Sequence, residues 1–223
     1  MLKKDFVICI QARTGSTRLP AKIFFSFFGE PIITRIIKIS KKITSNKNIY
    51  ILTGGKKLNQ SLSVVAKQNK IKIFYGNEKN VYSRFKSFLS YFQKKPKYVI
   101  RITSDNYLIQ PFLIKKMLKF CNQKDFDYSY IKPLSHYAGE IIKSNLFFKK
   151  KPSLKAKEHV TWDFRNKKDL RIISFPDNFF GINHKKSITL DNIDDFRTLT
   201  KLEHKYKGLK KINCIKEIKK IKL

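Results

Sequence analysis

The chain has 223 residues, of which 49 are Lys or Arg and 16 are Asp or Glu, so its formal net charge is +33. Apolar residues make up 42% and aromatic residues 13%, which excludes an intrinsically disordered protein despite the charge. Every apolar run falls short of the roughly 20 residues that a membrane-crossing helix needs, and residues 6–10 are too short for a signal peptide. Three cysteines without CxxC spacing argue against a disulfide framework or a zinc site. We therefore expect a cytoplasmic protein with a single domain spanning residues 1–223.

Most of the positive charge comes from lysine, with 41 Lys against 8 Arg. These lysines are spread along the whole chain, whereas tracts that bind nucleic acid usually form blocks. We interpret most of the charge as a solvated surface that attracts small anions, and we expect no specific nucleic-acid partner. A basic protein that binds nucleic acid or an anionic surface is the alternative from another class.

Strand and helix patterns alternate over the first half of the chain. Strands are expected at residues 5–10, 48–53, 71–75 and 97–103. Four helices are expected, the first beginning at Pro31 and the last at Pro111. The second runs from Leu58 to Ala66, and the third from Val81 to Phe92. The first has an apolar face formed by Ile32, Ile33, Ile36, Ile37 and Ile43. Strands separated by helices of this length predict an α/β fold with a mostly parallel sheet and right-handed crossovers.

The second half is less regular. Short strands are expected at residues 126–130, 139–143, 170–175 and 187–190, with helical pieces near Asn145 and Glu158. Asn192 is expected to cap a helix whose first turn contains Asp194 and Asp195. The tail, residues 208–223, has isoleucines among lysines; we expect a helix that packs on the core, with a membrane-surface helix as the alternative.

The most informative segment is residues 11–22, which directly follows the first strand. Arg13, Arg18 and Lys22 stand there with Gly15 and Ser16. Arginine forks can each bind two phosphate oxygens, and the backbone N–H groups of a glycine-containing turn bind anions. The spacing of a P-loop and of a Rossmann glycine motif is absent. We predict a phosphate-binding loop, the alternative being an exposed basic loop.

Asp105 follows the strand at residues 97–103, where ligands of open α/β sheets bind. If that strand lies beside the first one, Asp105 faces the basic loop. An acid beside a triphosphate site is repulsive unless a cation lies between them, and Mg²⁺ is held by one or two carboxylates together with phosphate oxygens. The alternative role for Asp105 is to cap a turn.

Three further polar positions are candidates. Asp191, after the strand expected at residues 187–190, is either a second metal ligand or part of the helix cap. Glu140 and His159 lie between the two acids along the chain, where contacts to an acceptor substrate are expected. His159 has a purely structural role as its alternative.

Taken together, these motifs resemble the cytidylyltransferase family that includes the CMP-sugar-acid synthetases, and most closely its spore-coat-polysaccharide (SpsF-type) branch. The resemblance runs in order along nearly the whole chain, and its first motif is highly specific. The matching motifs are IQARTGSTRLP (residues 10–20), GEPII (29–33), YGNEKNV (75–81), RITSD (101–105), EHVT (158–161) and TLDN (189–192).

The resemblance implies Mg²⁺-dependent transfer of CMP from CTP to a sugar acid or a sugar or polyol phosphate, with release of pyrophosphate, for surface glycan synthesis. It also implies a Rossmann-like three-layer α/β/α sandwich of the nucleotide-diphospho-sugar transferase type, and a homodimer. Residues 126–186 would form the acceptor-binding part. By the same analogy, the nucleotide is bound by Gln11, Ala12, Arg13, Gly15, Ser16, Arg18 and Lys22, the acceptor by Arg101, Glu140 and His159, and the metal by Asp105 and Asp191. Arg18, Lys22 and Asp105 would be catalytic.

The chain departs from the family pattern at several positions. Ala21 and Ser104 stand where the family usually has glycine, and Tyr107 where it has proline. An Asp-x-Glu motif is replaced by Ala138-Gly139-Glu140, so one acid is missing. The nucleotide-binding half therefore matches better than the acceptor-binding half, and a homologue that binds CTP without turnover is a further alternative.

Overall fold

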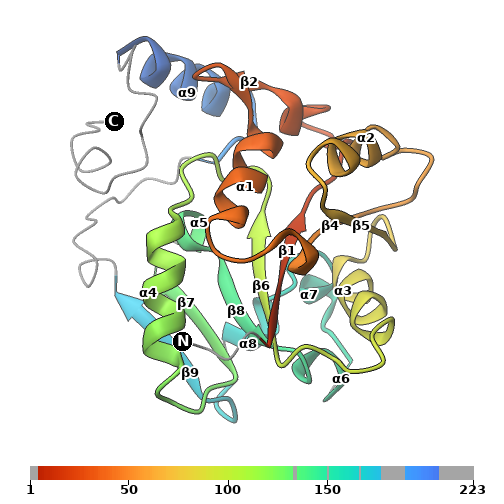
Figure 1. Ribbon diagram of the computed structural model, residues 1–223, viewed down its shortest axis with the longest axis vertical. Helices are drawn as coiled ribbons and strands as arrows, with labels where there is room; N and C mark the ends of the chain where they lie inside the picture. The colour runs from red at the N-terminus through yellow and green to blue at the C-terminus, as the bar shows by residue number, and fades with distance from the viewer. Residues whose placement is uncertain (1–4, 133–134, 150, 166, 177–188, 206–223) are drawn as a thin grey trace.

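The computed structural model describes residues 5–132, 135–149, 151–165, 167–176 and 189–205. A seven-stranded sheet runs through the middle of this part of the chain, in the order β5-β4-β1-β6-β8-β7-β9 (Figure 1). Its strands are β1 (Phe6–Gln11), β4 (Ile49–Thr53), β5 (Lys72–Tyr75), β6 (Tyr98–Thr103), β7 (Tyr128–Lys132), β8 (Glu140–Lys143) and β9 (Ile172–Pro176). Strand β8 is antiparallel to both of its neighbours, and all the other pairs are parallel.

The order of the strands reverses at β1. The chain passes from β1 outward through β4 to β5, and then returns to place β6 on the other side of β1. In the register of this pair, Gln11 lies opposite Thr103, so the two strands end level with each other. The loops that follow β1 and β6 therefore start side by side, at the point where ligands of open α/β sheets bind.

Helices cover both faces of the sheet. They are α1 (Ile32–Lys41), α2 (Ser61–Gln68), α3 (Val81–Ser90), α4 (Pro111–Cys121), α5 (Ser135–Ala138), α6 (Leu146–Lys149), α7 (Leu154–Glu158), α8 (Trp162–Arg165) and α9 (Ile193–Lys205). The 3₁₀ turns η1 (Lys22–Phe24) and η2 (Asn46–Asn48) and the hairpin β2 (Ser26–Phe27) and β3 (Glu30–Pro31) complete the described elements.

Alternate residues of β1 divide the core between the two faces, as the two-residue period of a strand requires. Ile8 and Ile10 pack in one cluster with apolar side chains from α1, α2, α4, α5 and α9. Val7 and Cys9 pack in the other cluster with side chains from α3, α6 and α8. The expected three-layer sandwich is therefore confirmed (Figure 1).

Several expected boundaries differ in the structure. Leu58 is 65% exposed and precedes α2, which begins at Ser61, so its place on that helix was predicted wrongly. Ile43 and Phe92 lie just beyond the ends of α1 and α3. Strand β8 begins only at Glu140, because Gly139 has a positive φ of 67°.

The strand expected at residues 187–190 is wrong where the structure describes it, since residues 189–190 are irregular. Residues 187–188 and the expected helix at 208–223 lie outside the described residues.

The cap expected for α9 is confirmed. The Asn192 Oδ1 atom accepts hydrogen bonds from the backbone N–H groups of Asp194 and Asp195, at 2.9 and 3.0 Å. In return, the Asp195 carboxylate accepts from the N–H groups of Asp191 and Asn192, at 2.8 and 3.0 Å. These reciprocal bonds satisfy N–H groups that the first turn of a helix leaves without partners, and they fix the backbone at Asp191.

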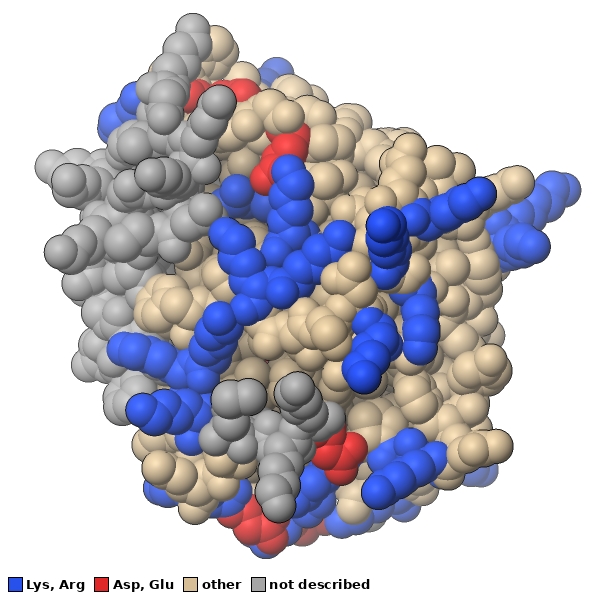
Figure 2. Space-filling model, in the orientation of Figure 1, with Lys and Arg blue, Asp and Glu red and all other residues tan. Residues whose placement is uncertain are grey.

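Lys and Arg side chains spread over most of the face seen in Figure 2, with few acidic side chains between them. Within the described ranges, no helix combines the length and the apolar character that a bilayer crossing would require.

Ala21 stands in the left-handed region, with φ 54° and ψ 20°, immediately before η1. This conformation explains why the family usually has glycine here, since a Cβ in it costs roughly 1 kcal/mol. We expect Ala21→Gly to stabilise the protein by up to about 1 kcal/mol in urea-induced unfolding, because the relieved strain outweighs the added freedom of the unfolded chain.

Ala66→Gly is the matched control, because Ala66 lies inside α2, where glycine destabilises by roughly 1 kcal/mol. Equal destabilisation by the two substitutions would contradict a strained Ala21.

Candidate active site

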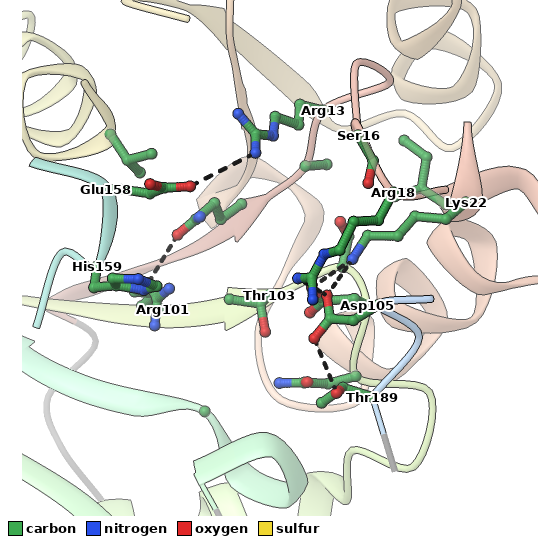
Figure 3. A pocket seen from close by; sticks show the side chains of 18 of the residues that line it. Arg13, Ser16, Arg18, Lys22, Arg101, Thr103, Asp105, Glu158, His159 and Thr189 are labelled. Atoms are coloured by element: carbon green, nitrogen blue, oxygen red, sulfur yellow. Dashed lines mark hydrogen bonds and ion pairs between the residues drawn. The ribbon is translucent and has the colours of Figure 1, made fainter. Parts of the chain in front are cut away.

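A cavity of about 540 Å³ lies at the carboxyl ends of β1 and β6. It is lined by nearly all of the side chains that we predicted for the site (Figure 3). They are Gln11, Ala12, Arg13, Ser16, Arg18, Lys22, Arg101, Asp105, Glu140, His159 and Asp191. Gly15 is the one predicted residue that does not line it. The lining residues span most of the described chain, so the fold brings distant segments to one place.

The basic loop, residues 12–22, is held by a buried asparagine on the neighbouring β4–α2 connection. The backbone N–H of Thr14 donates to Asn59 Oδ1 at 2.9 Å, and the Thr14 hydroxyl donates to the Leu58 carbonyl at 2.6 Å. The Asn59 amide group donates in turn to Glu78 Oε2 at 2.9 Å and to the Gly55 carbonyl at 3.0 Å. This side chain is fully buried, so the loop has a rigid support. The sequence reasoning missed Asn59.

We expect Asn59→Ala to raise the KM for the nucleotide by about tenfold, because the support for Thr14 and Glu78 is lost while the cations of the basic loop remain. Steady-state kinetics on the purified variant would check this. Asn69→Ala is a suitable control, since Asn69 caps the end of α2 with a bond to Val65 and lies outside the cavity. A KM that is unchanged in Asn59→Ala would show that the loop needs no such support.

Lys22 joins the two acids that we predicted to hold a metal. Its Nζ atom lies 3.1 Å from Asp105 Oδ2 and 2.7 Å from Asp191 Oδ1. Arg18 adds a longer contact of 3.7 Å to Asp191, and its side chain is 67% exposed. The three segments that carry these residues are far apart in the sequence, yet their charged groups meet at one point (Figure 3).

The backbone fixes the distance between the two acid-bearing segments. The N–H group of Leu190 donates to the carbonyl oxygen of Asp105 at 3.0 Å. Burial tends to raise the pKa of Asp191, but the hydrogen bond from Lys22 and the charges of Lys22 and Arg18 outweigh it and bring the pKa below its ordinary value. Asp191 is therefore an anion over the whole physiological range.

The donor set fits a hard divalent cation such as Mg²⁺. Both acids offer a carboxylate oxygen to the same ammonium group, so these oxygens converge on one point. In the described part of the chain no group of three or more His, Cys, Asp or Glu side chains is placed to hold a metal. Two carboxylates without further protein ligands suit Mg²⁺, which commonly takes its remaining ligands from phosphate oxygens and water.

Glu140 is the centre of a buried ionic network at the floor of the cavity. Its Oε2 atom accepts from Arg101 Nη1 at 2.5 Å, and its Oε1 atom accepts from Arg165 Nη2 at 2.6 Å, from the Tyr128 hydroxyl at 2.5 Å and from the Thr161 hydroxyl at 2.9 Å. Burial would raise the pKa of Glu140, but the charges of Arg101 and Arg165 and these hydrogen bonds lower it to about 2. Since only 1% of this side chain is exposed, it positions its neighbours, and its direct contact with an acceptor stays a prediction.

Arg101 connects this network to Gln11, at the end of β1. Its Nε atom donates to Gln11 Oε1 at 2.8 Å, while Nη1 is taken by Glu140. The guanidinium is thus held from two sides, with 15% of the side chain exposed. Gly139 makes this arrangement possible, because a Cβ there would stand 2.5 Å from the Arg101 carbonyl oxygen. The glycine of the Ala138-Gly139-Glu140 segment is therefore required by close packing.

Arg13, Glu158 and His159 line the part of the cavity that lies away from Lys22 and Asp105 (Figure 3). Arg13 Nη2 lies 3.9 Å from Glu158 Oε1, and both side chains are substantially exposed. His159 is the residue that ends α7, and its ring lines the cavity. Its role as an acceptor contact stays a prediction.

Besides Asn59, sequence reasoning missed three residues that shape the site. Arg165 and Tyr128 complete the network around Glu140. Arg84 is 1% exposed and lines the cavity, and its guanidinium donates to the carbonyl oxygens of Asn77 and Glu78. The signal for Arg84 was available, because only 8 arginines occur in the chain and this one follows the YGNEKNV motif by a few positions.

Known proteins are similar to this chain in sequence and in fold. A family model described as "Cytidylyltransferase" matches residues 7–171. The chain is 28% identical to the spore coat polysaccharide biosynthesis protein SpsF of Bacillus subtilis over 214 residues, which cover 90% of this chain and 87% of that protein. The structure of a cytidylyltransferase from Leptospira borgpetersenii is similar with a TM-score of 0.81 at 21% identity, covering 96% of this chain and 92% of that one.

The fold also extends to a CMP-2-keto-3-deoxy-manno-octonic acid synthetase solved with CTP, with a TM-score of 0.65 at 12% identity, covering 90% of this chain and 98% of that one. At these identities the solved structures establish the fold, whereas the family model covers well over half of the sequence. The chain belongs to the cytidylyltransferase family of nucleotidyltransferases.

Proposed function

We propose that this chain transfers CMP from CTP to a small anionic acceptor, a sugar acid or a sugar or polyol phosphate, and releases pyrophosphate. The family membership and the SpsF relative support this reaction and a place in surface glycan synthesis. The solved synthetase that was bound to CTP supports the choice of nucleotide.

The observation that carries the proposal is the meeting of Lys22, Asp105 and Asp191 on the wall of one cavity. Cations from the loop after β1 and acids from two other loops share a single point there. A polyphosphate is bound by cationic side chains. A divalent cation that links the polyphosphate to the protein is bound by carboxylates. An exposed basic loop with no such function would have no reason to converge on two acids.

The basic loop would bind the triphosphate, and its main chain beside Gln11 and Ala12 would read the cytosine. Arg13 and Arg18 line the cavity, and among the described residues each makes a single ion pair, of 3.9 and 3.7 Å, which leaves N–H groups available for phosphate oxygens. In the reaction, Arg18 and Lys22 would balance the charge that grows on the departing pyrophosphate.

Asp105 and Asp191 would hold Mg²⁺. When bound, this ion supplies charge neutralisation and fixes the orientation of the α-phosphate for attack in line. A phosphate or carboxylate nucleophile is already ionised, so no strong general base is needed. This agrees with the cavity, where His159 has no carboxylate partner among the described residues.

Residues 126–186 would supply most of the acceptor side. Arg101 faces the cavity from the floor, and its Nη2 group makes no ion pair or hydrogen bond with the described residues. Arg84 also lines the cavity, and these two guanidinium groups give it positive charge, which supports an anionic acceptor.

The test is a pyrophosphate-release assay with CTP, Mg²⁺ and a panel of sugar acids and sugar or polyol phosphates. We expect release with CTP and a subset of these acceptors, and much less with ATP, GTP or UTP. CTP binding without turnover on any acceptor would favour a non-catalytic homologue. Steeply salt-dependent binding to any duplex without CTP binding would favour the rival reading as a basic nucleic-acid-binding protein.

A further inference from the structure

We propose that Lys22 serves as an internal counter-ion that closes the metal site until a nucleotide arrives. In the structure, its ammonium group occupies the point between Asp105 and Asp191, where it would exclude a divalent ion. Binding of the triphosphate draws the ammonium group onto phosphate oxygens and frees both carboxylates. This inference rests on the proposed function, because it concerns the order in which CTP and the metal occupy the same site.

The contacts of Lys22 carry the inference. A single Nζ atom touches one oxygen of each carboxylate, at 3.1 and 2.7 Å, and only 12% of the lysine side chain is exposed. By contrast, Arg18 lies 3.7 Å from Asp191, has 67% of its side chain exposed and makes no ion pair with Asp105 among the described residues. Lys22 alone of these two cations therefore bridges the acids.

A divalent ion cannot share this position with the ammonium group. Mg²⁺ requires carboxylate oxygens at about 2.0–2.1 Å, and the oxygens that converge on Lys22 are the ones it would use. Two cations within a few ångströms of each other also repel strongly in a partly buried site. Either Lys22 leaves or the metal stays out.

The structure also contains a means of releasing Lys22. Its flexible four-carbon stem begins at η1, at the end of the basic loop, so the ammonium group can turn toward that loop without moving the backbone. Arg13 and Arg18 each make a single long ion pair with the part of the chain that the structure describes, so they are available to take the first phosphate contacts. A triphosphate that the two arginines hold offers Lys22 phosphate oxygens, and it carries more negative charge than the two carboxylates together. Metal alone is thus expected to bind weakly, and the nucleotide or its metal complex to bind first.

The experiment is a titration of the full chain with Mn²⁺ in the absence of nucleotide, with free Mn²⁺ measured by electron paramagnetic resonance. We expect Lys22→Met to bind Mn²⁺ at least tenfold more tightly than the wild type. Arg13→Met is the matched control, since it removes one charge from the same cavity without touching Asp105 or Asp191; we expect it to resemble the wild type. Lys22→Gln provides a second variant if Lys22→Met does not give a native circular dichroism spectrum.

The double variant Lys22→Met with Asp191→Asn tests the position of the metal. We expect it to lose the higher Mn²⁺ affinity of Lys22→Met. The inference is overturned if the wild type binds Mn²⁺ as tightly as Lys22→Met, if Arg13→Met gives the same gain, or if the gain survives in the double variant. The pyrophosphate-release assay with CTP, Mg²⁺ and the acceptor panel reports on the proposed function. A failure of the proposed function would therefore appear in that assay, and a failure of the counter-ion role in the Mn²⁺ titrations.

Discussion

We expect Asp105→Asn to lower the rate of the proposed CTP turnover by at least about 100-fold and to change the free energy of unfolding by less than about 1 kcal/mol. The substitution keeps the size of the side chain but removes one of the two negative charges that meet Lys22. Loss of one preorganised electrostatic partner of the reacting groups commonly costs 10²–10³ in rate. The effect on folding is small because a quarter of this side chain is exposed and the backbone contact from Leu190 to Asp105 is kept.

The measurement is the pyrophosphate-release assay at saturating CTP, combined with urea unfolding of the same preparation. Asp194→Asn is the matched control, because Asp194 lies near Asp191 in the sequence but its side chain is 81% exposed and pairs with Arg197. We expect this control to keep the wild-type rate. Near-normal turnover in Asp105→Asn would remove Asp105 from the mechanism.

Glu140→Gln has the largest expected effect on stability, a loss of about 3–5 kcal/mol at pH 7. The substitution removes the negative charge that Arg101 and Arg165 share in a buried place. It also puts an amide NH₂ group, which is a donor, among the four donors whose hydrogen bonds the carboxylate accepts. Chemical denaturation monitored by circular dichroism would measure this loss. Glu158→Gln is the control, since this carboxylate is 66% exposed and its ion pair is 3.9 Å long.

The lowered pKa of Glu140 predicts how the stability of the protein depends on pH. This pKa is about 2 in the folded protein, against an ordinary value of 4.5, so folding favours the ionised form. The stabilisation is therefore complete above about pH 4.5 and is lost as the pH falls toward 2, by an amount on the order of 3 kcal/mol. Glu140→Gln should flatten the acid branch of the stability curve in this interval. An acid branch as steep as that of the wild type would show that Glu140 is not the group responsible.

The regular elements of the first half were predictable because each has a clear period. The isoleucines of α1 recur with helical spacing, and β1, β4 and β6 are short apolar runs that end in polar loops. The hairpin of β2 and β3 and the helices α5 and α8 were missed, because elements of two to four residues are too short to show a period. The position of β8 between β6 and β7 is likewise set by long-range pairing, which the local sequence does not encode.

The candidate site was predictable to the extent that its residues stand in recognisable local motifs. Asp191 lies beyond the residues 7–171 that the family model matches. It was a candidate because it was expected at the end of a strand and because TLDN (189–192) resembles a family motif, although residues 189–190 prove to be irregular. Asn59 and Arg165 could not be found in this way. Their importance comes from hydrogen bonds to residues 45 and 25 positions away, and nothing in their own neighbourhoods indicates those partners.

The order of the elements along the chain has a consequence for biosynthesis. The seven strands of the large sheet lie within residues 6–176, whereas Asp191 and the capped end of α9 are synthesised later. A polypeptide truncated after Pro176 would carry every strand of the sheet and the basic loop, but it would lack Asp191, one of the two acids that contact Lys22. If Asp105 and Asp191 hold the metal as proposed, we expect such a product to be inactive in CMP transfer.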